Sequence, residues 1–269
     1  MPDQPPAPAT SDAAPRPGDS FVQSFARGLS VIRSFSASAP RQTLTQVAQR
    51  AGLTRAGARR ILLTLAQLGY VESQGRLFQL TPRILDLGFA YLSSLPLWDL
   101  AEPVMETLAA EARESCSAAV LDGPDIVYVM RVHTHKIMSI NLGIGSRLPA
   151  WCTSMGRVLL AALDDAELQR RLALAPRNAR TARTLTAEAE LLAAITAVRQ
   201  QGWCLVDQEL EEGLVSLAAP ILDRGGRTIA ALNISGQANR TPAPLLIERH
   251  LPLLRSAAQQ ISQLLQMKA

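Results

Sequence analysis

Three arginines in the N-terminal third of the chain, Arg55, Arg59 and Arg60, have the clearest chemical purpose in the sequence. They stand in the first two turns of a segment with helical periodicity, and no acidic residue lies among them. The N-terminal end of a helix is already partly positive, so cations placed there need an anion from outside the chain. A DNA duplex offers both phosphates and base edges to such a helix.

The segment from Leu44 to Leu68 predicts two short helices joined by a tight turn. Gly52 suits the left-handed residue that ends the first helix, and the Thr54 hydroxyl can cap the second. The second helix has an apolar face at helical spacing, formed by Ala58, Ile61, Leu62, Leu65 and Leu68. This is the layout of a helix-turn-helix, in which the second helix enters the major groove. An αα-hairpin with a solvated basic face is the alternative.

A β-hairpin is predicted directly after this helix. Residues 70–71 and 77–80 have strand-like composition, and the turn between them contains Gly75. A hairpin at this position is the wing of a winged helix-turn-helix, and its tip can reach phosphate or the minor groove. We therefore expect contact with double-stranded operator DNA from helix, turn and wing, through Thr45, Thr54, Arg55, Ala56, Arg59, Arg60, Gln74 and Arg76.

The charge of the chain is divided unevenly. Residues 21–85 contain nine arginines and one acid, Glu72, whereas the whole chain has a net charge of only +4. The remainder is therefore mildly acidic. A small basic module beside a larger acidic one indicates nucleic-acid binding at one end and another task at the other.

A second set of polar residues is suited to binding an anion. Cys152, Thr153 and Ser154 precede a predicted helix, so their backbone N–H groups are free to face a carboxylate. Arg147, in the glycine-containing loop just before, can clamp such a group. Helix capping for Thr153 and Ser154, and a solvated loop charge for Arg147, are the alternatives. Ser216 and Asn233 interrupt apolar strands, and the expected apolar walls are Ile140, Leu142, Leu148 and Met155.

Two other groupings suggest different chemistry. Asp207, Glu209, Glu211 and Glu212 could serve acid–base catalysis, but a solvated loop near the mouth of the pocket is the preferred interpretation. His133 and His135 could bind zinc or form a redox switch with Cys116, Cys152 and Cys204. No CxxC or HxxxH spacing is present. We expect no catalytic residue, no metal and no cofactor.

The length of 269 residues suits two domains, and 48% hydrophobic residues allow sizeable cores. No apolar run reaches the roughly 18 residues of a membrane span, and the N-terminus lacks the features of a signal peptide. Three widely spaced cysteines fit reduced thiols. We expect a cytoplasmic protein without membrane contact.

Periodicity along the chain predicts an α+β fold. Residues 1–20, rich in Pro and Ala, are expected to be disordered. A winged helix-turn-helix domain follows over 21–81, with a first helix that buries Phe25, Leu29, Ile32 and Phe35. A linker helix covers 82–96. Residues 97–269 form an antiparallel or mixed sheet flanked by helices, with strands expected at 117–121, 126–132, 137–142, 203–207, 215–221 and 228–234, a loop at 143–149, and helices at 98–113, 154–163, 165–174, 186–200 and 244–267.

Three segments carry a family resemblance: GLTRAGARRILLTLAQLGYV, GIGSRLPAWCTSMGRVLLAAL and GWCLVDQELEEGLVSLAAPILDRGGRTIAALNISG. With them the chain resembles the IclR family of bacterial transcriptional regulators over nearly all of residues 21–267. LPAWCTSMGRVLLA and VDQELEEGL look closest to the branch that controls protocatechuate and β-ketoadipate catabolism.

The resemblance implies a GAF-like effector-binding domain, a homodimer or tetramer, and a small-molecule carboxylate as effector, with RNA polymerase as a further candidate partner. The family's pocket positions fall on Ile140, Leu148, Cys152, Ser154, Met155, Val206, Ser216 and Asn233. Val206 stands where some relatives carry an acid. The expected function is a ligand-responsive DNA-binding regulator. An enzyme with a DNA-binding tether and a metal- or redox-sensing regulator are the alternatives.

Overall fold

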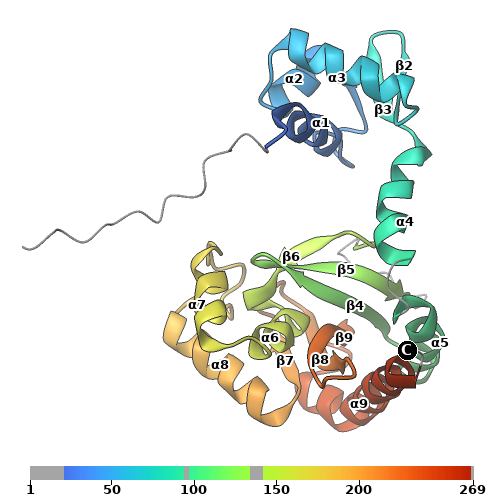
Figure 1. Cartoon of the computed structure of the whole chain (residues 1–269). Helices are drawn as coiled ribbons and strands as arrows, with labels where there is room; N and C mark the ends of the chain where they lie inside the picture. Colours follow the sequence, from blue (N-terminus) through green and yellow to red (C-terminus); the bar gives the residue numbers. More distant parts are fainter. Residues whose placement is uncertain (1–20, 94–96, 134–141, 268–269) are drawn as a thin grey trace, which may run out of the picture. The chain divides into compact units, whose positions relative to one another are not determined.

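The computed structural model describes residues 21–93, 97–133 and 142–267 (Figure 1). The predicted tail 1–20 lies outside these residues. The described chain divides into two compact units, with the boundary between Tyr91 and Leu92. Each unit has its own buried core.

The first unit is a winged helix-turn-helix, as predicted. Its three antiparallel strands lie in the order β1-β3-β2. Strand β1, three residues long, was not predicted, because the segment 36–42 with Pro40 was interpreted as a break after the first helix. The elements are α1 (Gln23–Arg33), β1 (Arg41–Thr43), α2 (Leu44–Arg50), α3 (Arg55–Gln67), β2 (Val71–Gln74), β3 (Leu77–Leu80), the 3-10 turn η1 (Pro82–Ile84) and α4 (Leu85–Ser93).

Local signals set the two helices of the motif. Thr43 and Gln46 form a capping box at the start of α2. Gly52 has a φ of 65° after α2, and the Thr54 hydroxyl accepts the backbone N–H of Gly57 at 3.1 Å to cap α3. The core beneath them consists of Val31, Val47, Ala48, Ala58, Leu62, Leu65 and Val71.

Two expectations about buried faces were wrong. Phe25 is 68% exposed and Leu29 is 41% exposed, whereas Val31 is fully buried. Only the C-terminal turn of α1 reaches the core, through Val31 and Ile32, together with Phe35 just after the helix. Leu68 is 52% exposed because it follows the last residue of α3 as its C-cap.

The second unit is built on a six-stranded sheet with the order β6-β5-β4-β9-β8-β7, in which every neighbouring pair is antiparallel. The predicted loop 143–149 ends in the edge strand β6, and the predicted strand 137–142 falls almost entirely outside the described residues. The elements are α5 (Leu97–Ala112), β4 (Ser115–Asp122), β5 (Asp125–Val132), β6 (Arg147–Pro149), the 3-10 turn η2 (Ala150–Cys152), α6 (Ser154–Ala161), α7 (Asp165–Ala173), α8 (Glu188–Gln201), β7 (Cys204–Asp207), β8 (Leu214–Leu222), β9 (Thr228–Gln237) and α9 (Ala243–Met267).

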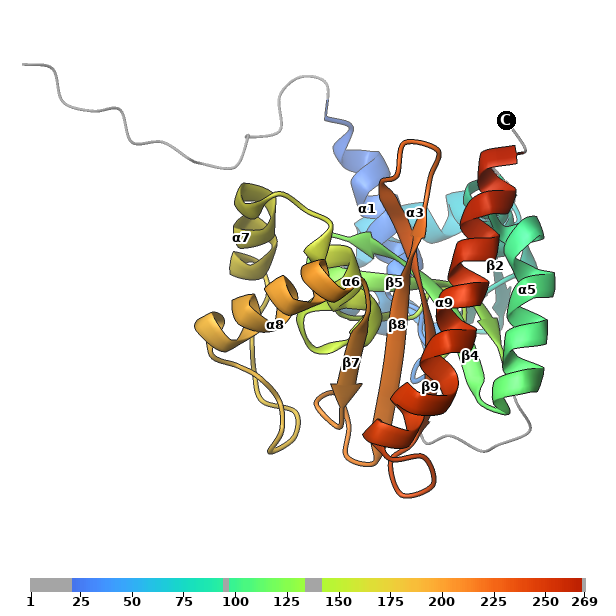
Figure 2. The same cartoon turned by 90° about the horizontal axis from the view of Figure 1, so that it is seen from below.

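Helices cover both faces of this sheet (Figure 2). Helices α5 and α9 pack on one face, while α6 and α8 pack on the other. Because side chains alternate along a strand, Leu217 and Ile234 enter the α5/α9 core, and their neighbours Ser216, Asn233 and Ser235 face α6. No described helix combines the length and apolarity that crossing a bilayer requires.

Candidate functional site

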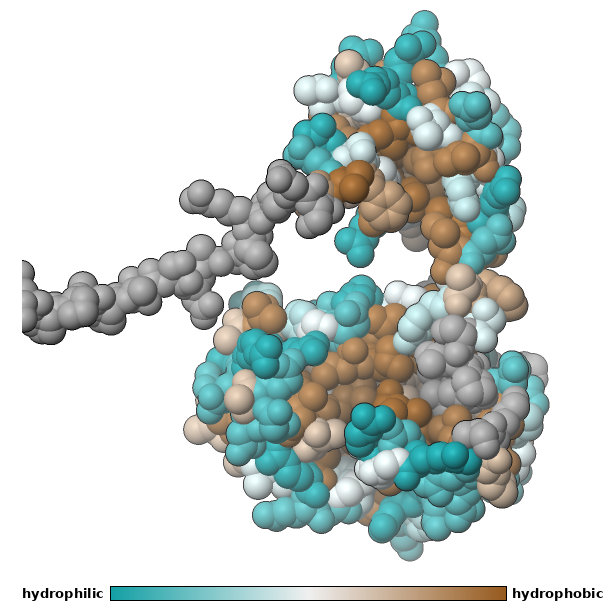
Figure 3. All heavy atoms as spheres, in the orientation of Figure 1, coloured by the Kyte–Doolittle hydropathy of each residue, from teal (hydrophilic) through white to brown (hydrophobic). Residues whose placement is uncertain are grey.

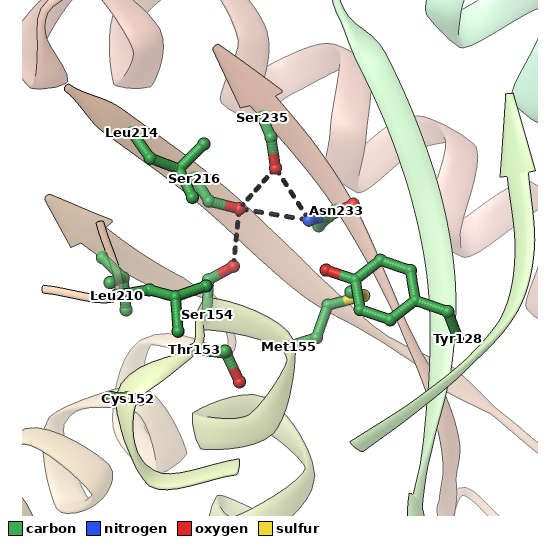
Figure 4. Close-up of a pocket in the computed structure, with 11 residues that line it drawn as sticks. Tyr128, Cys152, Thr153, Ser154, Met155, Leu210, Leu214, Ser216, Asn233 and Ser235 are labelled. Carbon is green, nitrogen blue, oxygen red and sulfur yellow. Dashed lines mark hydrogen bonds between the residues drawn. The ribbon is translucent and has the colours of Figure 1, made fainter. Parts of the chain in front are cut away.

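A pocket lies between the sheet and the N-terminal end of α6 (Figure 4). The empty space around its walls is about 330 Å³ when open solvent at its mouth is included. Its described walls combine aliphatic side chains with hydroxyl and amide groups, and none of them is charged. The lining residues are Tyr128, Cys152, Thr153, Ser154, Met155, Val206, Leu210, Leu214, Ser216, Asn233 and Ser235.

Four polar side chains in the pocket form one hydrogen-bonded cluster. The Ser154 and Ser216 hydroxyl oxygens are 2.8 Å apart, and those of Ser216 and Ser235 are 3.0 Å apart. The Asn233 Nδ2 donates to Ser235 at 2.9 Å and to Ser216 at 3.2 Å. Strands β8 and β9 and helix α6 thus bring together residues that are up to 81 positions apart in the chain.

A hydrogen bond from the backbone of β4 orients the Asn233 amide. Its Oδ1 accepts the backbone N–H of Ser117 at 2.9 Å, on the neighbouring strand β4. Since the carbonyl side is held by this bond, the NH₂ group points at the hydroxyls. The NH₂ group donates to Ser216 and Ser235, and the three hydroxyls can rotate, so a carboxylate could accept hydrogen bonds from the cluster by replacing bonds within it.

Thr153 and Gly156 fix the position of α6. The Thr153 hydroxyl accepts the Gly156 N–H at 3.2 Å and donates to the Pro149 carbonyl at 3.0 Å, so it caps the helix. A Cβ on Gly156 would lie 2.1 Å from the carbonyl oxygen of Ala150. This absence of a side chain lets α6 begin directly against η2, with Ser154 aimed at the sheet.

Four lining residues were missed by sequence analysis: Tyr128, Leu210, Leu214 and Ser235. Tyr128 is buried, and this burial raises the pKa of its phenol to about 12. A β-bulge in β5 pairs Ala119 with Tyr128 and Ala118 with Met130. The residue without a pair in this bulge is Val129, so Tyr128 still alternates with Ile126, and both lie in the core on the α6 face of the sheet.

Arg147 does not line this pocket. Its guanidinium donates to the Asp122 carboxylate at 2.6 Å and to Asp125 at 3.3 Å, which ties β6 to the β4–β5 turn. These hydrogen bonds to Asp122 and Asp125 raise the pKa of Arg147. Leu148 packs at the edge of the core on the α6 face rather than in the pocket. Ile140 lies outside the described residues.

The interpretation of the acidic loop as solvated was wrong for Glu209. This carboxylate is 7% exposed and accepts two hydrogen bonds of 2.6 Å from Arg157 of α6, which is 3% exposed. Its Oε2 also accepts the backbone N–H of Leu185 at 3.1 Å. Asp207 pairs with Arg183 at 2.5 Å. Glu209 thereby anchors the loop that carries Leu210 into the pocket.

The cysteines have the properties of structural thiols. Cys116, Cys152 and Cys204 are buried, and burial raises their pKa values to about 12, 11 and 12. A neutral buried thiol is a poor nucleophile and a poor metal ligand. Within the described residues, no group of three His, Cys, Asp or Glu side chains is placed to hold a metal; His135 falls outside them.

The predicted DNA-contacting residues of the helices lie on the surface of the first unit. Thr45 is exposed on the first turn of α2, and Arg55, Ala56, Arg59 and Arg60 are exposed on α3. Within the described part of the chain, no side-chain hydrogen bond or ion pair engages the three arginines. Thr54 is also exposed, but its hydroxyl caps the helix.

The wing presents the two remaining residues. Gln74 and Arg76 flank Gly75 at the β2–β3 turn, and both are exposed. Gly75 has a φ of 63°, and Gln74 pairs with Leu77, so the turn has two residues with glycine first. The hairpin is thus short and well defined, with a cation at its tip.

Two protein-family models match the chain. The IclR helix-turn-helix domain matches residues 24–75, and the C-terminal domain of bacterial transcriptional regulator IclR matches residues 89–263. Together they cover both compact units.

Individual proteins show the same relationship. The Pca regulon regulatory protein of Pseudomonas putida is 46% identical over 90% of this chain and 83% of its own length. A Rhodococcus sp. RHA1 protein described as a transcriptional regulator is 52% identical with a TM-score of 0.82, over 90% of this chain and 98% of that one. An IclR homolog from Microbacterium hydrocarbonoxydans, solved with 4-hydroxybenzoate, is 25% identical with a TM-score of 0.79, over 90% and 98%. The chain belongs to the IclR family of bacterial transcriptional regulators.

Proposed function

We propose that this chain binds operator DNA and responds to a small aromatic carboxylate, in control of protocatechuate and β-ketoadipate catabolism. The observation that carries the proposal is the uncharged cluster of donors, Ser154, Ser216, Ser235 and Asn233, at the base of a pocket with apolar walls. In this division of labour, residues 21–81 bind DNA, 82–96 connect the domains and 97–269 bind the effector, all in the cytoplasm with the DNA.

The chemistry of the pocket supports a benzoate-like ligand. The donor cluster can receive a carboxylate, while Met155, Val206 and Leu214 offer apolar contact to a ring. Tyr128 adds a neutral phenol that can bond a ring hydroxyl. The 4-hydroxybenzoate in the Microbacterium homolog is a ligand of this class.

The exposed arginines of α3 support binding in the major groove. Three guanidiniums at one helix start, without a partner among the described residues, can meet phosphates and the acceptor edges of guanine. Thr45 and Arg76 are proposed to contact the backbone on either side. With these contacts, α3 would be the recognition helix of the motif.

A homodimer is the proposed assembly, alone or within a tetramer. Large apolar side chains are exposed on the described surface of α1 and α4, where Figure 3 shows apolar residues gathered: Phe25 and Leu29 on α1, and Leu85, Leu87, Phe89 and Tyr91 on α4. Such surface is typical of a protein interface. A two-fold dimer would match a palindromic operator.

Binding without turnover is also part of the proposal. The pocket offers neutral hydroxyls, a buried thiol with a raised pKa and a phenol with a raised pKa, and none of these is an activated nucleophile at neutral pH. The ligand is proposed to act by binding two arrangements of the DNA-binding domains with unequal affinity.

Isothermal titration of the full chain with 4-hydroxybenzoate and protocatechuate tests the proposal. We expect saturable binding and no loss of the acid on prolonged incubation. Absence of binding to either acid, together with absence of a thermal shift, would contradict the ligand assignment; steady conversion would indicate an enzyme.

A further inference from the structure

A second cavity shares the η2 turn with the effector pocket. Trp151 lines this second cavity, whereas its neighbour Cys152 lines the effector pocket. With open solvent at their mouths included, the empty space is about 670 Å³ for the second cavity and about 330 Å³ for the effector pocket. Its walls come from the β4–β5 turn, from Pro149 and Trp151, and from the loop 175–180 that follows α7.

The wall of this cavity contains an unsatisfied donor. Trp151 is 1% exposed, and its indole Nε1 has no hydrogen-bond partner among the described residues. A buried indole N–H normally has an acceptor, and leaving it without one destabilises the folded state. A ligand acceptor that reached this N–H from the cavity would supply the missing hydrogen bond.

A guanidinium that is not committed to another side chain stands at the same cavity. Nearby arginines are committed: Arg147 to Asp122, Arg157 to Glu209, and Arg183 to Asp207. Arg180 makes no side-chain hydrogen bond or ion pair within the described chain. The positive charge of Arg180 acts on the η2 turn. It lowers the pKa of the Cys152 thiol, although burial, the larger effect, raises that pKa.

The remaining walls define what could bind there. Pro124, Pro149 and Pro176 give flat apolar surfaces beside the indole, and Asn178 adds an amide. The acidic residue among the described walls, Asp125, already accepts a hydrogen bond from Arg147 at 3.3 Å. A cation and an indole N–H together with apolar walls fit an anion on a flat apolar body.

We propose that this cavity is a second binding site for a small aromatic carboxylate, in which Arg180 holds the carboxylate and Trp151 donates its indole N–H. The site uses none of the hydroxyl cluster of the effector pocket. It therefore stands independently of whether the effector pocket binds the same acid.

Equilibrium dialysis of the full chain with 4-hydroxybenzoate tests this assignment. We expect two molecules bound per chain in the wild type, and one in the Ser154→Leu variant, whose effector pocket is filled. Adding Arg180→Ala to Ser154→Leu should weaken the remaining site at least tenfold. Adding Arg255→Ala instead, which removes an exposed charge from α9 on the opposite face of the sheet, should leave that site unchanged.

Two further measurements keep the test valid if the double variant does not fold. Arg180→Ala in the wild-type background should reduce the number of bound molecules from two to one. The indole ¹H–¹⁵N signal of Trp151, assigned from its loss in Trp151→Phe, should shift as the second site fills. The proposal is overturned if the wild type binds a single molecule and this signal does not move, or if the binding that remains in Ser154→Leu is unchanged by Arg180→Ala.

Discussion

A carboxylate in the effector pocket would meet neutral donors, since none of the described lining residues carries a charge. Ser154 is the member of the donor cluster contributed by α6, and it is 2% exposed. Ser154→Leu is expected to place an isobutyl group against Ser216 and abolish the response to the ligand, while DNA affinity stays within twofold. Titration calorimetry and a DNA-binding assay measure the two effects; a normal ligand response in this variant would place the site elsewhere.

The arginines of α3 make a separate prediction at the same scale. Arg59→Ala and Arg60→Ala should each weaken operator binding by about 1–3 kcal/mol, because each removes a guanidinium from the base edges. Arg249→Ala, which removes an exposed charge from α9, is the control and should have no such effect. Fluorescence anisotropy with labelled operator DNA provides the measurement. If Arg59→Ala and Arg60→Ala bind operator DNA as tightly as Arg249→Ala and the wild type, α3 does not enter the groove.

Burial of Tyr128 and the thiols predicts how stability depends on pH. Folding raises the pKa of Cys116 and Cys204 to about 12, that of Cys152 to about 11 and that of Tyr128 to about 12. The folded protein thus keeps protons that the unfolded chain releases above pH 9 to 10. The free energy of unfolding should be unaffected by these groups below pH 8 and fall by about 1.4 kcal/mol per group and pH unit above their unfolded pKa values. Urea unfolding at pH 8 and pH 10.5 tests this; equal stabilities would contradict it.

At the scale of elements, the Arg157–Glu209 pair joins α6 to the loop that carries Leu210. Glu209→Gln leaves Arg157 buried without its counter-charge, which should cost about 3–5 kcal/mol of stability. The ligand affinity should fall as well, because the loop loses its anchor. Leu254→Ala, in the core on the opposite face, controls for destabilisation alone. If both variants lose the same stability and the same affinity, the pair has no specific effect on the pocket.

The close approach of η2 and α6 gives a second prediction about elements. Gly156→Ala places a Cβ about 2.1 Å from the Ala150 carbonyl oxygen, so α6 or η2 must move. We expect a loss of at least about 1–3 kcal/mol in the free energy of unfolding. Gly88→Ala on α4, where a Cβ meets no atom within 4 Å, is the matched control. A Gly156→Ala variant as stable as this control would contradict the close approach.

Local pattern was sufficient for much of the fold and for part of the pocket. Helical spacing and turn residues located α2, α3 and the wing, and a break in apolar composition indicated Ser216 and Asn233. Long-range pairing was invisible to this reasoning. The carboxylates of Asp122 and Asp125 that bind Arg147 lie at the β4–β5 turn, which meets β6 only in the folded sheet. The short strand β1 likewise owes its existence to pairing with β3.

At the scale of the whole molecule, a regulator needs its two units to be energetically linked. The proposed link is the segment that contains α4, which joins the winged helix to the effector-binding domain. A ligand can change DNA binding only if it favours one arrangement of the DNA-binding domains over another. The change in DNA affinity must then equal the reciprocal change in ligand affinity when DNA is bound.

The central claim is tested most directly by fluorescence anisotropy of duplex DNA from upstream of the coding sequence, titrated with the full chain at low ionic strength. The titration is repeated with saturating 4-hydroxybenzoate or protocatechuate, and with Ser154→Leu as the control. We predict binding by both proteins, and at least a fivefold change in affinity with one of the acids for the wild type alone. A chain that ignores duplex DNA under all these conditions would contradict the account.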